Sequence, residues 1–385
     1  MEKIRLKGIT WNHSRGLLPM VATAQRFAEL NPGVEISWEK RSLQQFADLS
    51  IAELAARFDL LVIDHPWAGY AAKSAAILPL DKYLGAAFLE DQARQSVGAS
   101  YESYSFDSRQ WALPIDAATP VAASRPDLLK ERQLSLPGSF HDLLYLAEQG
   151  LVAFAGIPID VLMNFYTLCC SSGEDPCQSE TEVVSKATGI RVLKLYRELA
   201  SLIDRENFNR NPIQVYEAMT CADDIAYCPF AYGYSNYARA GYARRELRFH
   251  DMISLDGQTR LRSTLGGTGL AISARCSEVE TAVAYLRYCA DPQTQQTLYF
   301  DNGGQPGHRA AWLNAEVNRR SGNYFLDTLP ALDRAFLRPR YAGHMYFQDH
   351  AGDIVRDYLM QGGNEEQVLC ELNELYVRSK NLIPA

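Results

Sequence analysis

The sequence lacks any long hydrophobic run. A membrane-spanning helix needs about 20 consecutive apolar residues, whereas the nearest candidates, Phe58 to Ile63 and Ala76 to Leu80, have only the length of a strand. It also lacks an excess of basic residues, since 38 Lys and Arg stand against 46 Asp and Glu and give a net charge of −8. Proteins that bind nucleic acids need a basic face. The sequence therefore predicts a protein that is neither embedded in a membrane nor bound to nucleic acid.

Enzyme motifs are equally scarce. The sequence contains no His-Glu-x-x-His, no Gly-x-Ser-x-Gly and no Gly-x-Gly-x-x-Gly. Gly266, Gly267 and Gly269 are close together, but the Lys-Ser/Thr of a Walker phosphate loop does not follow them. We therefore predict no cofactor and no metal site.

The cysteines and the first residues bear on the cellular compartment. A secretory signal has a basic start, an apolar run and a small-residue cleavage site, whereas Met1 to Leu6 leads directly into a strand-like segment. Exported proteins usually pair their cysteines, and Cys228, Cys289 and Cys370 lie in patterns typical of buried thiols. We expect a cytoplasmic protein if this N-terminus is native, and a periplasmic one if a signal peptide was removed; a disulfide among the other cysteines stays open. The eight cysteines are Cys169, Cys170, Cys177, Cys221, Cys228, Cys276, Cys289 and Cys370, and their spacing is not that of a zinc knuckle.

The first eighty residues alternate between strand and helix patterns. Ile4 to Trp11 has a strand pattern, and apolar residues at helical spacing predict a helix over Leu17 to Leu30. Asn31-Pro32-Gly33 ends that helix, and Val34 to Trp38 alternates as a second strand. Phe58 to Ile63 is typical of a buried parallel strand. These segments predict an open α/β sheet, in which ligands bind beyond the carboxyl ends of the strands.

The full length of 385 residues suits two α/β lobes better than one core. Ser139 and Asp142 predict the capping box of a helix that Gly150 ends. Asp291-Pro292 predicts the first turn of another helix, and the chain from Tyr324 onward has a largely helical pattern.

The order of these segments resembles the family 1 extracellular solute-binding proteins, whose best-known members carry sugars to ABC importers. Four segments carry the resemblance: Gly8 to Ile36, Trp111 to Leu129, Gly266 to Ser273, and Gly303 to Arg309. The resemblance implies an α/β, two-lobed periplasmic-binding-protein-like type II fold with a central interlobe cleft. It implies lobe 1 from residues 1–114 and 262–312, and lobe 2 from residues 115–261 and 313–385.

Polar and aromatic residues cluster where such a cleft would lie. The aromatic rings would cover a sugar ring, the carboxylates would accept hydrogen bonds from its hydroxyls, and the helix start beside Arg15 would suit an anion. The predicted ligand-binding residues are Trp11, Asn12, His13, Arg15, Asp64, His65, Trp67, Asp116, Tyr232, Tyr234, Asn236, Tyr237, Gly267 and Gln305. Further, weaker candidates are Arg309, Arg338, Arg340, Tyr341 and His344.

Each group of candidates has a purely structural alternative. Asn12 or Ser14 would only cap a helix, and Asp64 would only bond backbone amides. Trp11 and Trp67 would pack between or beside the lobes, Asp116 would fix the hinge, and the tyrosines would pack a loop. Gln305 would lie in a surface turn.

Our leading hypothesis is that the two lobes close by a hinge over a small polar solute: a carbohydrate, a polyol or a sugar acid. An ABC-transporter permease would be its partner if the protein is exported. The alternative is a cytoplasmic enzyme that acts on a small organic acid or acyl compound with His13, His65 and Asp64 as acid–base groups. A third hypothesis is a ligand-sensing partner of a regulator. Both histidines and Asp64 within hydrogen-bond reach of one pocket would favour the enzyme.

Overall fold

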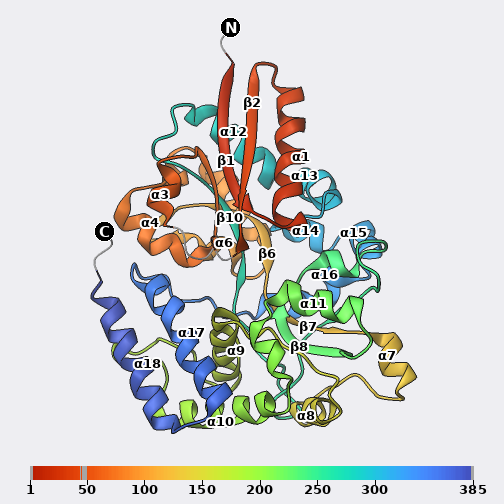
Figure 1. Cartoon of the computed structure of the whole chain (residues 1–385). Helices are drawn as coiled ribbons and strands as arrows, with labels where there is room; N and C mark the ends of the chain where they lie inside the picture. The colour runs from red at the N-terminus through yellow and green to blue at the C-terminus, as the bar shows by residue number, and fades with distance from the viewer. Residues whose placement is uncertain (1–2, 44, 46–49, 383–385) are drawn as a thin grey trace.

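The computed structural model describes residues 3–43, 45 and 50–382, and the chain forms two lobes, each around its own sheet (Figure 1). The first sheet has the strand order β2-β1-β3-β10-β6. Its strands are β1 (Ile4–Trp11), β2 (Val34–Arg41), β3 (Leu60–Ile63), β6 (Leu113–Ala118) and β10 (Gly266–Ile272). β1 pairs in parallel with β2 and β3, and β10 runs antiparallel between β3 and β6. The predicted open α/β sheet is confirmed.

Alternation along β3 explains why its four residues are all apolar. Leu60 and Val62 pack on one face, against α1 (Ser14–Leu30) and α12 (Val279–Ala290). Leu61 and Ile63 pack on the other face, against α3 (Ile51–Ala55) and α4 (Ala68–Ser74). A strand covered by helices on both faces needs apolar side chains at every position.

The second lobe has a three-stranded antiparallel sheet of order β8-β7-β9. Its strands are β7 (Pro120–Ser124), β8 (Tyr227–Tyr232) and β9 (Arg248–His250). The helices of this lobe are α7 (Pro126–Glu131), α8 (Phe140–Glu148), α9 (Pro158–Ser171), α10 (Lys186–Ser201), α11 (Pro212–Cys221), α17 (His344–Gln361) and α18 (Glu365–Lys380). The largest core cluster joins α9, α10, α17 and α18. The helical C-terminal part that the sequence predicts is therefore confirmed.

The helix signals in the sequence are mostly confirmed. Ser139 and Asp142 form the capping box of α8, and Gly150 follows that helix with φ of +70°. Asp291 caps α13 (Pro292–Thr294), which continues as the π-helical turn η5 (Gln295–Tyr299). α1 begins three residues earlier than predicted, because Nδ1 of His13 accepts a hydrogen bond from the backbone N of Arg15 at 3.0 Å and so caps the helix.

Three segments lie side by side at the junction of the lobes. β6 continues through Thr119 into β7, and the chain returns through Ser263 and Thr264 into β10. The Thr119 hydroxyl lies 2.6 Å from Oγ of Ser263 and donates to the Thr264 carbonyl at 2.9 Å. The backbone N of Phe336 bonds the Ser263 carbonyl at 2.7 Å, which adds the third segment. The hinge expected of two lobes therefore has a defined place in the chain.

The segment after β10 joins both lobes. Phe300 directly follows η5, and Trp312 is the last residue of α14 (Arg309–Trp312). Both pack in one cluster with Val121 and Phe249 of the second sheet. α15 (Ala315–Arg320) follows, and α16 (Tyr324–Asp333) packs beside α15 and β9. The predicted lobe boundaries at residues 114, 261 and 312 stay a prediction.

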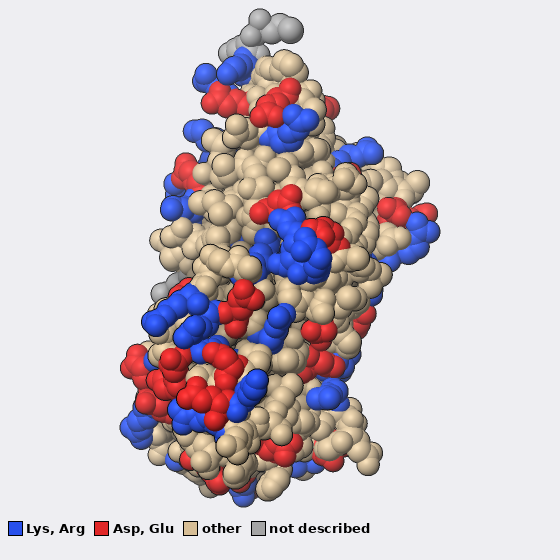
Figure 2. Space-filling view, turned by 90° about the vertical axis from the view of Figure 1, so that its right-hand side faces the viewer, with Lys and Arg blue, Asp and Glu red and all other residues tan. Residues whose placement is uncertain are grey.

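All eight cysteines are free thiols. Cys228 and Cys289 are buried, as predicted, but Cys370 is exposed on α18, so the prediction that it is buried was wrong. Within the described ranges, no helix is long and apolar enough to span a bilayer. On the face seen in Figure 2, acidic and basic side chains form mixed clusters rather than one extended area of a single sign.

Candidate functional site

A cavity of about 740 Å³ lies between the two lobes. The first lobe contributes Trp11, Arg15, Leu43 and Asp64; the junction contributes Ala118, Gly266, Gly267 and Thr268. The second lobe and the segment before α17 contribute Ile157, Pro158, Ile159, Asp160, Asn211, Pro212, Gln214, Tyr232, Tyr234, Arg338, Gln348, Asp349 and Asp353. The loops after β1 and β3 thus meet the segment after β8 across one cavity, which is the arrangement that the sequence predicts.

Two aromatic rings of the wall lie directly on glycines. A Cβ atom on Gly16 would lie 2.3 Å from Cδ2 of Trp11, and one on Gly266 would lie 2.4 Å from Cε1 of Tyr232. Any larger residue would push the ring away, because carbon atoms do not approach so closely. The Tyr232 hydroxyl lies 3.0 Å from Oγ1 of Thr264, which fixes the second ring. Both rings are therefore held in place before any ligand arrives.

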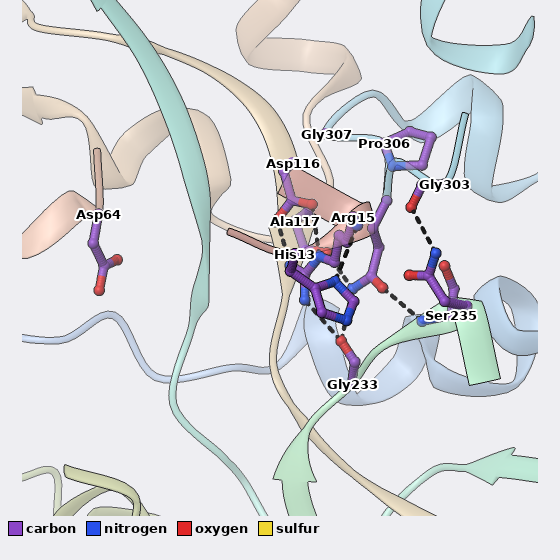
Figure 3. A network of polar contacts seen from close by, with 12 residues as sticks. His13, Arg15, Asp64, Asp116, Ala117, Gly233, Ser235, Gly303, Pro306 and Gly307 are labelled. Carbon is purple, nitrogen blue, oxygen red and sulfur yellow. Dashed lines mark hydrogen bonds and ion pairs between the residues drawn. The ribbon is translucent and has the colours of Figure 1, made fainter. Parts of the chain in front are cut away.

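Arg15 is buried in the wall and bound to Asp116 (Figure 3). Its Nε donates to Oδ2 of Asp116 at 2.8 Å, its Nη2 donates to Oδ1, and its Nη1 donates to the Gly233 carbonyl at 2.9 Å. Burial by itself would lower the pKa of Arg15, but Asp116 raises it above its ordinary value, so the pair stays charged. Asp116 is 1% exposed and lies behind the wall. We predicted that Asp116 binds the ligand. Instead it accepts hydrogen bonds from Arg15 and does not line the cavity.

Asp64 and Arg338 form a second ion pair in the wall. Nη2 of Arg338 donates to both carboxylate oxygens of Asp64 at 2.7 Å, and its Nη1 donates to Oε1 of Gln348 at 3.0 Å. Burial would raise the pKa of Asp64, but Arg338 lowers it well below its usual range. Asp64 also accepts the backbone N–H of His65 at 2.8 Å. It therefore lines the cavity as predicted and bonds the backbone as the structural alternative required.

Asp160 and Thr268 are the wall residues whose polar atoms stay unsatisfied. Asp160 is 6% exposed and Thr268 is 5% exposed. Oδ2 of Asp160 and Oγ1 of Thr268 have no hydrogen-bond partner within the part of the chain that the structure describes. Burial raises the pKa of Asp160 to about 8. Burying a polar group without a hydrogen-bond partner costs free energy. A polar ligand that bonds to either oxygen would therefore recover that free energy.

Neither residue was predicted from the sequence. Asp160 follows Pro158, the first residue of α9, so it reads as an ordinary acidic residue of a first helical turn. Thr268 reads as one residue of a return strand. The remaining wall residues that the sequence did not indicate are Leu43, Ala118, Ile157, Ile159, Asn211, Pro212, Gln214, Gln348, Asp349 and Asp353.

The two predicted histidines do not line the cavity. Nε2 of His13 lies 3.3 Å from the Tyr242 hydroxyl, so both ring nitrogens have protein contacts. His65 is 1% exposed, and its Nδ1 lies 3.3 Å from Oδ1 of Asp64. Burial lowers the pKa of each histidine to about 4, with a smaller effect of Arg15 on His13 and of Arg338 on His65. Figure 3 shows Asp64 well apart from His13 and Arg15. The structure does not assemble the acid–base group of the enzyme hypothesis.

Five more predicted residues also lie outside the wall. Trp67 is buried and packs edge-to-face on Tyr70, with ring centroids 5.4 Å apart, and Asn12 is exposed. The other three hold segments together. Asn236 bonds the Gly303 carbonyl at 3.2 Å, the Tyr237 hydroxyl bonds Oε1 of Glu217 at 2.6 Å, and Gln305 bonds the Ala117 carbonyl at 2.9 Å and the Ser235 N–H at 3.0 Å. Gln305 is fully buried, because it joins segments of both lobes. It therefore lies neither in the cavity, as we predicted, nor in a surface turn, as the structural alternative required.

Gly267, Tyr232 and Tyr234 lie in the wall as predicted. Gly267 has φ of +98°, and a Cβ there would lie 2.4 Å from the Asp116 carbonyl oxygen, so only glycine fits. The ring of Tyr234 lies 4.7 Å from Cζ of Arg15 and 4.7 Å from the ring of His13. Among the described residues, no group of three or more His, Cys, Asp or Glu is arranged to hold a metal ion. That any of these residues touches a ligand stays a prediction.

Comparisons with known proteins agree with the fold. Residues 11–150 match the family model of the bacterial extracellular solute-binding proteins. Among solved structures, maltose-bound MalE3 of T. maritima superposes with a TM-score of 0.84 at 16% identity, over 97% of this chain and 99% of the other. An ABC-transporter solute-binding protein of Agrobacterium radiobacter K84 in complex with ribitol gives 0.82 at 16% identity, over 99% of each chain.

A third solved structure is the ABC-transporter solute-binding protein of Thermotoga lettingae TMO bound with α-D-tagatose. It gives a TM-score of 0.82 at 14% identity, over 98% of this chain and 100% of the other. No curated protein sequence matches this chain. The two-lobed fold of the solute-binding proteins is thus confirmed over the whole chain. The family model matches residues 11–150, and this match agrees with the resemblance to the family 1 extracellular solute-binding proteins that the sequence indicates.

Proposed function

We propose that this protein binds a small carbohydrate or polyol in the interlobe cavity and closes over it by a hinge motion. The observation that carries the proposal is the wall itself: aromatic residues from both lobes line one cavity of about 740 Å³ together with Asp160 and Thr268, each of which has a buried side-chain oxygen without a hydrogen-bond partner among the described residues. Sugars and polyols present hydroxyl groups on a partly apolar frame. Such ligands suit a wall of rings and polar atoms.

The charges of the wall disfavour a sugar acid. A sugar acid needs a cation with free hydrogen-bond donors, but Arg15 is held by Asp116 and Gly233, and Arg338 by Asp64 and Gln348. The proteins of similar structure are described with maltose, ribitol and α-D-tagatose, all uncharged polyhydroxy compounds. This similarity supports the proposed class of ligand.

Delivery to the permease of an ABC importer is part of the proposal. In that role the ligand-bound, closed form is the one a permease recognises, because ligand contacts both lobes only when the lobes are closed. The role requires that the protein lie outside the cytoplasmic membrane. Cell fractionation, with a periplasmic and a cytoplasmic marker enzyme, tests this.

A thermal-shift screen against sugars and polyols, followed by titration calorimetry, tests binding. A ligand present at 100 times its Kd stabilises the native state by about 2.7 kcal/mol. We expect Gly266→Ala to weaken the best hit at least about tenfold, because the new Cβ displaces the Tyr232 ring. Gly85→Ala is the matched control, since a Cβ at Gly85 meets no atom within 4 Å. No shift from any sugar or polyol, or equal affinity in both variants, would refute the proposed site.

A further inference from the structure

The carboxyl group of Asp160 has an environment unlike that of the other buried charges of the cavity. It lies in the first turn of α9, lines the cavity, and is more than nine-tenths buried. Its Oδ2 has no hydrogen-bond partner among the described residues, and no ion pair joins it to a cation there. A buried carboxylate is stable only when it is paired. A partner for this carboxylate must therefore come from outside the described residues, or the group must hold a proton.

The neighbours of Asp160 supply no charge of either sign. Titratable groups of α10, α11 and β8 and the segment after it interact with it, and burial raises the pKa of every one above its ordinary value, so all are neutral. They are Tyr196, Tyr216, Cys228, Tyr232 and Tyr234. From α17, which packs on α9, Asp349 and Asp353 line the same cavity. A cation that enters would thus meet carboxyl groups and tyrosine rings, and the two arginines among the described wall residues are each paired with an aspartate.

The whole wall has an excess of negative charge. Its acidic residues are Asp64, Asp160, Asp349 and Asp353, of which Asp160 holds a proton until a cation binds, and its basic residues are Arg15 and Arg338. Arg15 is neutralised from behind by Asp116, and Arg338 by Asp64. Tyr232 and Tyr234 add π faces near Asp160, and such faces attract cations.

From this geometry we infer that the cavity takes a cationic polyhydroxy ligand, a sugar or polyol with a protonated amine, and that Asp160 determines this specificity by pairing with the ammonium group. The inference rests on the proposed function and names its ligand class more closely. Binding of the ammonium would release the proton that burial keeps on Asp160, since its pKa is raised to about 8. The N-terminal end of α9 favours the carboxylate that is then formed.

Matched pairs of ligands test the inference by calorimetry on the full chain: glucosamine against glucose, galactosamine against galactose, and 1-amino-1-deoxyglucitol against glucitol. In at least one pair we expect the amine to bind at least about tenfold more tightly than the alcohol. Its affinity should increase from pH 6 to pH 8, while that of the alcohol changes less. Asp160→Asn should abolish the preference and leave the alcohol bound. Asp357→Asn, which changes an exposed carboxylate of α17 that does not line the cavity, should keep it.

Circular dichroism and binding of the uncharged partner show that Asp160→Asn is folded with its cavity intact. Equal or reversed affinities in the wild type, with the alcohol bound, would overturn the inference and leave the proposed function standing. A preference that survives Asp160→Asn would overturn the role of Asp160. If no amine and no alcohol binds, the proposed function fails, and the inference fails with it.

Discussion

The two sides of the cavity treat buried charge in opposite ways. At the junction of the lobes, Arg15 and Asp116 share two hydrogen bonds, and Arg338 and Asp64 share two more. At the start of α9, Asp160 is almost as deeply buried but has no cation and no hydrogen bond to its Oδ2 within the described chain. The paired charges satisfy one another within the protein. The unpaired carboxyl group is left to pair with a ligand in the cavity. The difference distinguishes residues that hold the cavity wall in place from a residue that is free to contact the ligand.

The largest expected effect breaks a pair. Asp116→Ala leaves the guanidinium of Arg15 buried without its carboxylate, and removing one partner of a buried ion pair costs roughly 3–5 kcal/mol. We expect the free energy of unfolding, measured by urea denaturation, to fall by about that amount. Asp91→Ala is the control, because Asp91 is 44% exposed and its partner Arg94 is 73% exposed. It should cost less than about 1 kcal/mol. Equal losses in the two variants would contradict the comparison.

The next largest effect concerns the unpaired Asp160 and is seen in how the free energy of unfolding depends on pH. The pKa of Asp160 is about 8 in the folded protein and about 3.9 in an unfolded chain. Between these values the folded state binds one proton more, so this group makes the free energy of unfolding fall as pH rises from 4 to 8. Asp160→Asn removes that slope. At pH 9 we expect the variant to exceed the wild type by on the order of 2 kcal/mol or more, and at pH 4 to match it.

Urea denaturation of both proteins over this pH range measures the difference. The subtraction is needed because the partly buried His13 and the buried His65, whose pKa values are lowered to about 4, act in the opposite direction. They favour the fold when neutral and destabilise it as pH falls from about 6.5 toward 4. Asp353→Asn should change the curve by less than about 0.5 kcal/mol, since it replaces an exposed side chain. A constant difference between wild type and Asp160→Asn at all pH values would show that Asp160 is not buried as a lone carboxyl group.

The smallest expected effect compares two threonines near the junction. Thr268→Val removes a hydroxyl without a partner among the described residues, so the free energy of unfolding should change by less than about 0.5 kcal/mol or increase. Thr119→Val removes a hydroxyl with contacts to Ser263 and Thr264 at 2.6 and 2.9 Å and should cost about 1–2 kcal/mol. For the best sugar or polyol, Thr268→Val should weaken binding about fivefold. A stability loss in Thr268→Val as large as in Thr119→Val would contradict the assignment of its hydroxyl to the ligand.

The corrections to the predicted site have one physical origin. Sequence reasoning placed polar residues that follow strands in the cleft, and for Trp11, Arg15, Asp64, Tyr232 and Tyr234 the structure places them in its wall. The same reasoning does not reveal whether another segment has already taken up the side chain. Asp116 faces Arg15 and Gln305 faces the Ala117 carbonyl, and these partners are 101 and 188 residues away in the chain.

The sequence by itself determined the class of fold. Its apolar alternation, helix caps and glycines act over a few residues, so the α/β sheet, the capping box of α8 and the helical C-terminal part were all predictable. It also placed the glycine at position 267, where the crossing segments approach too closely for a side chain.

Only the tertiary structure decided which polar groups are satisfied within the protein and which remain for a ligand. Asp116 and Asp160 are both buried aspartates, and the local sequence does not reveal which of them has a cation beside it. Arg15 of α1 reaches the first, which lies in β6, and no described cation reaches the second. Electrostatic pairing depends on distances in space between distant segments, and those distances exist only once both lobes have folded and met.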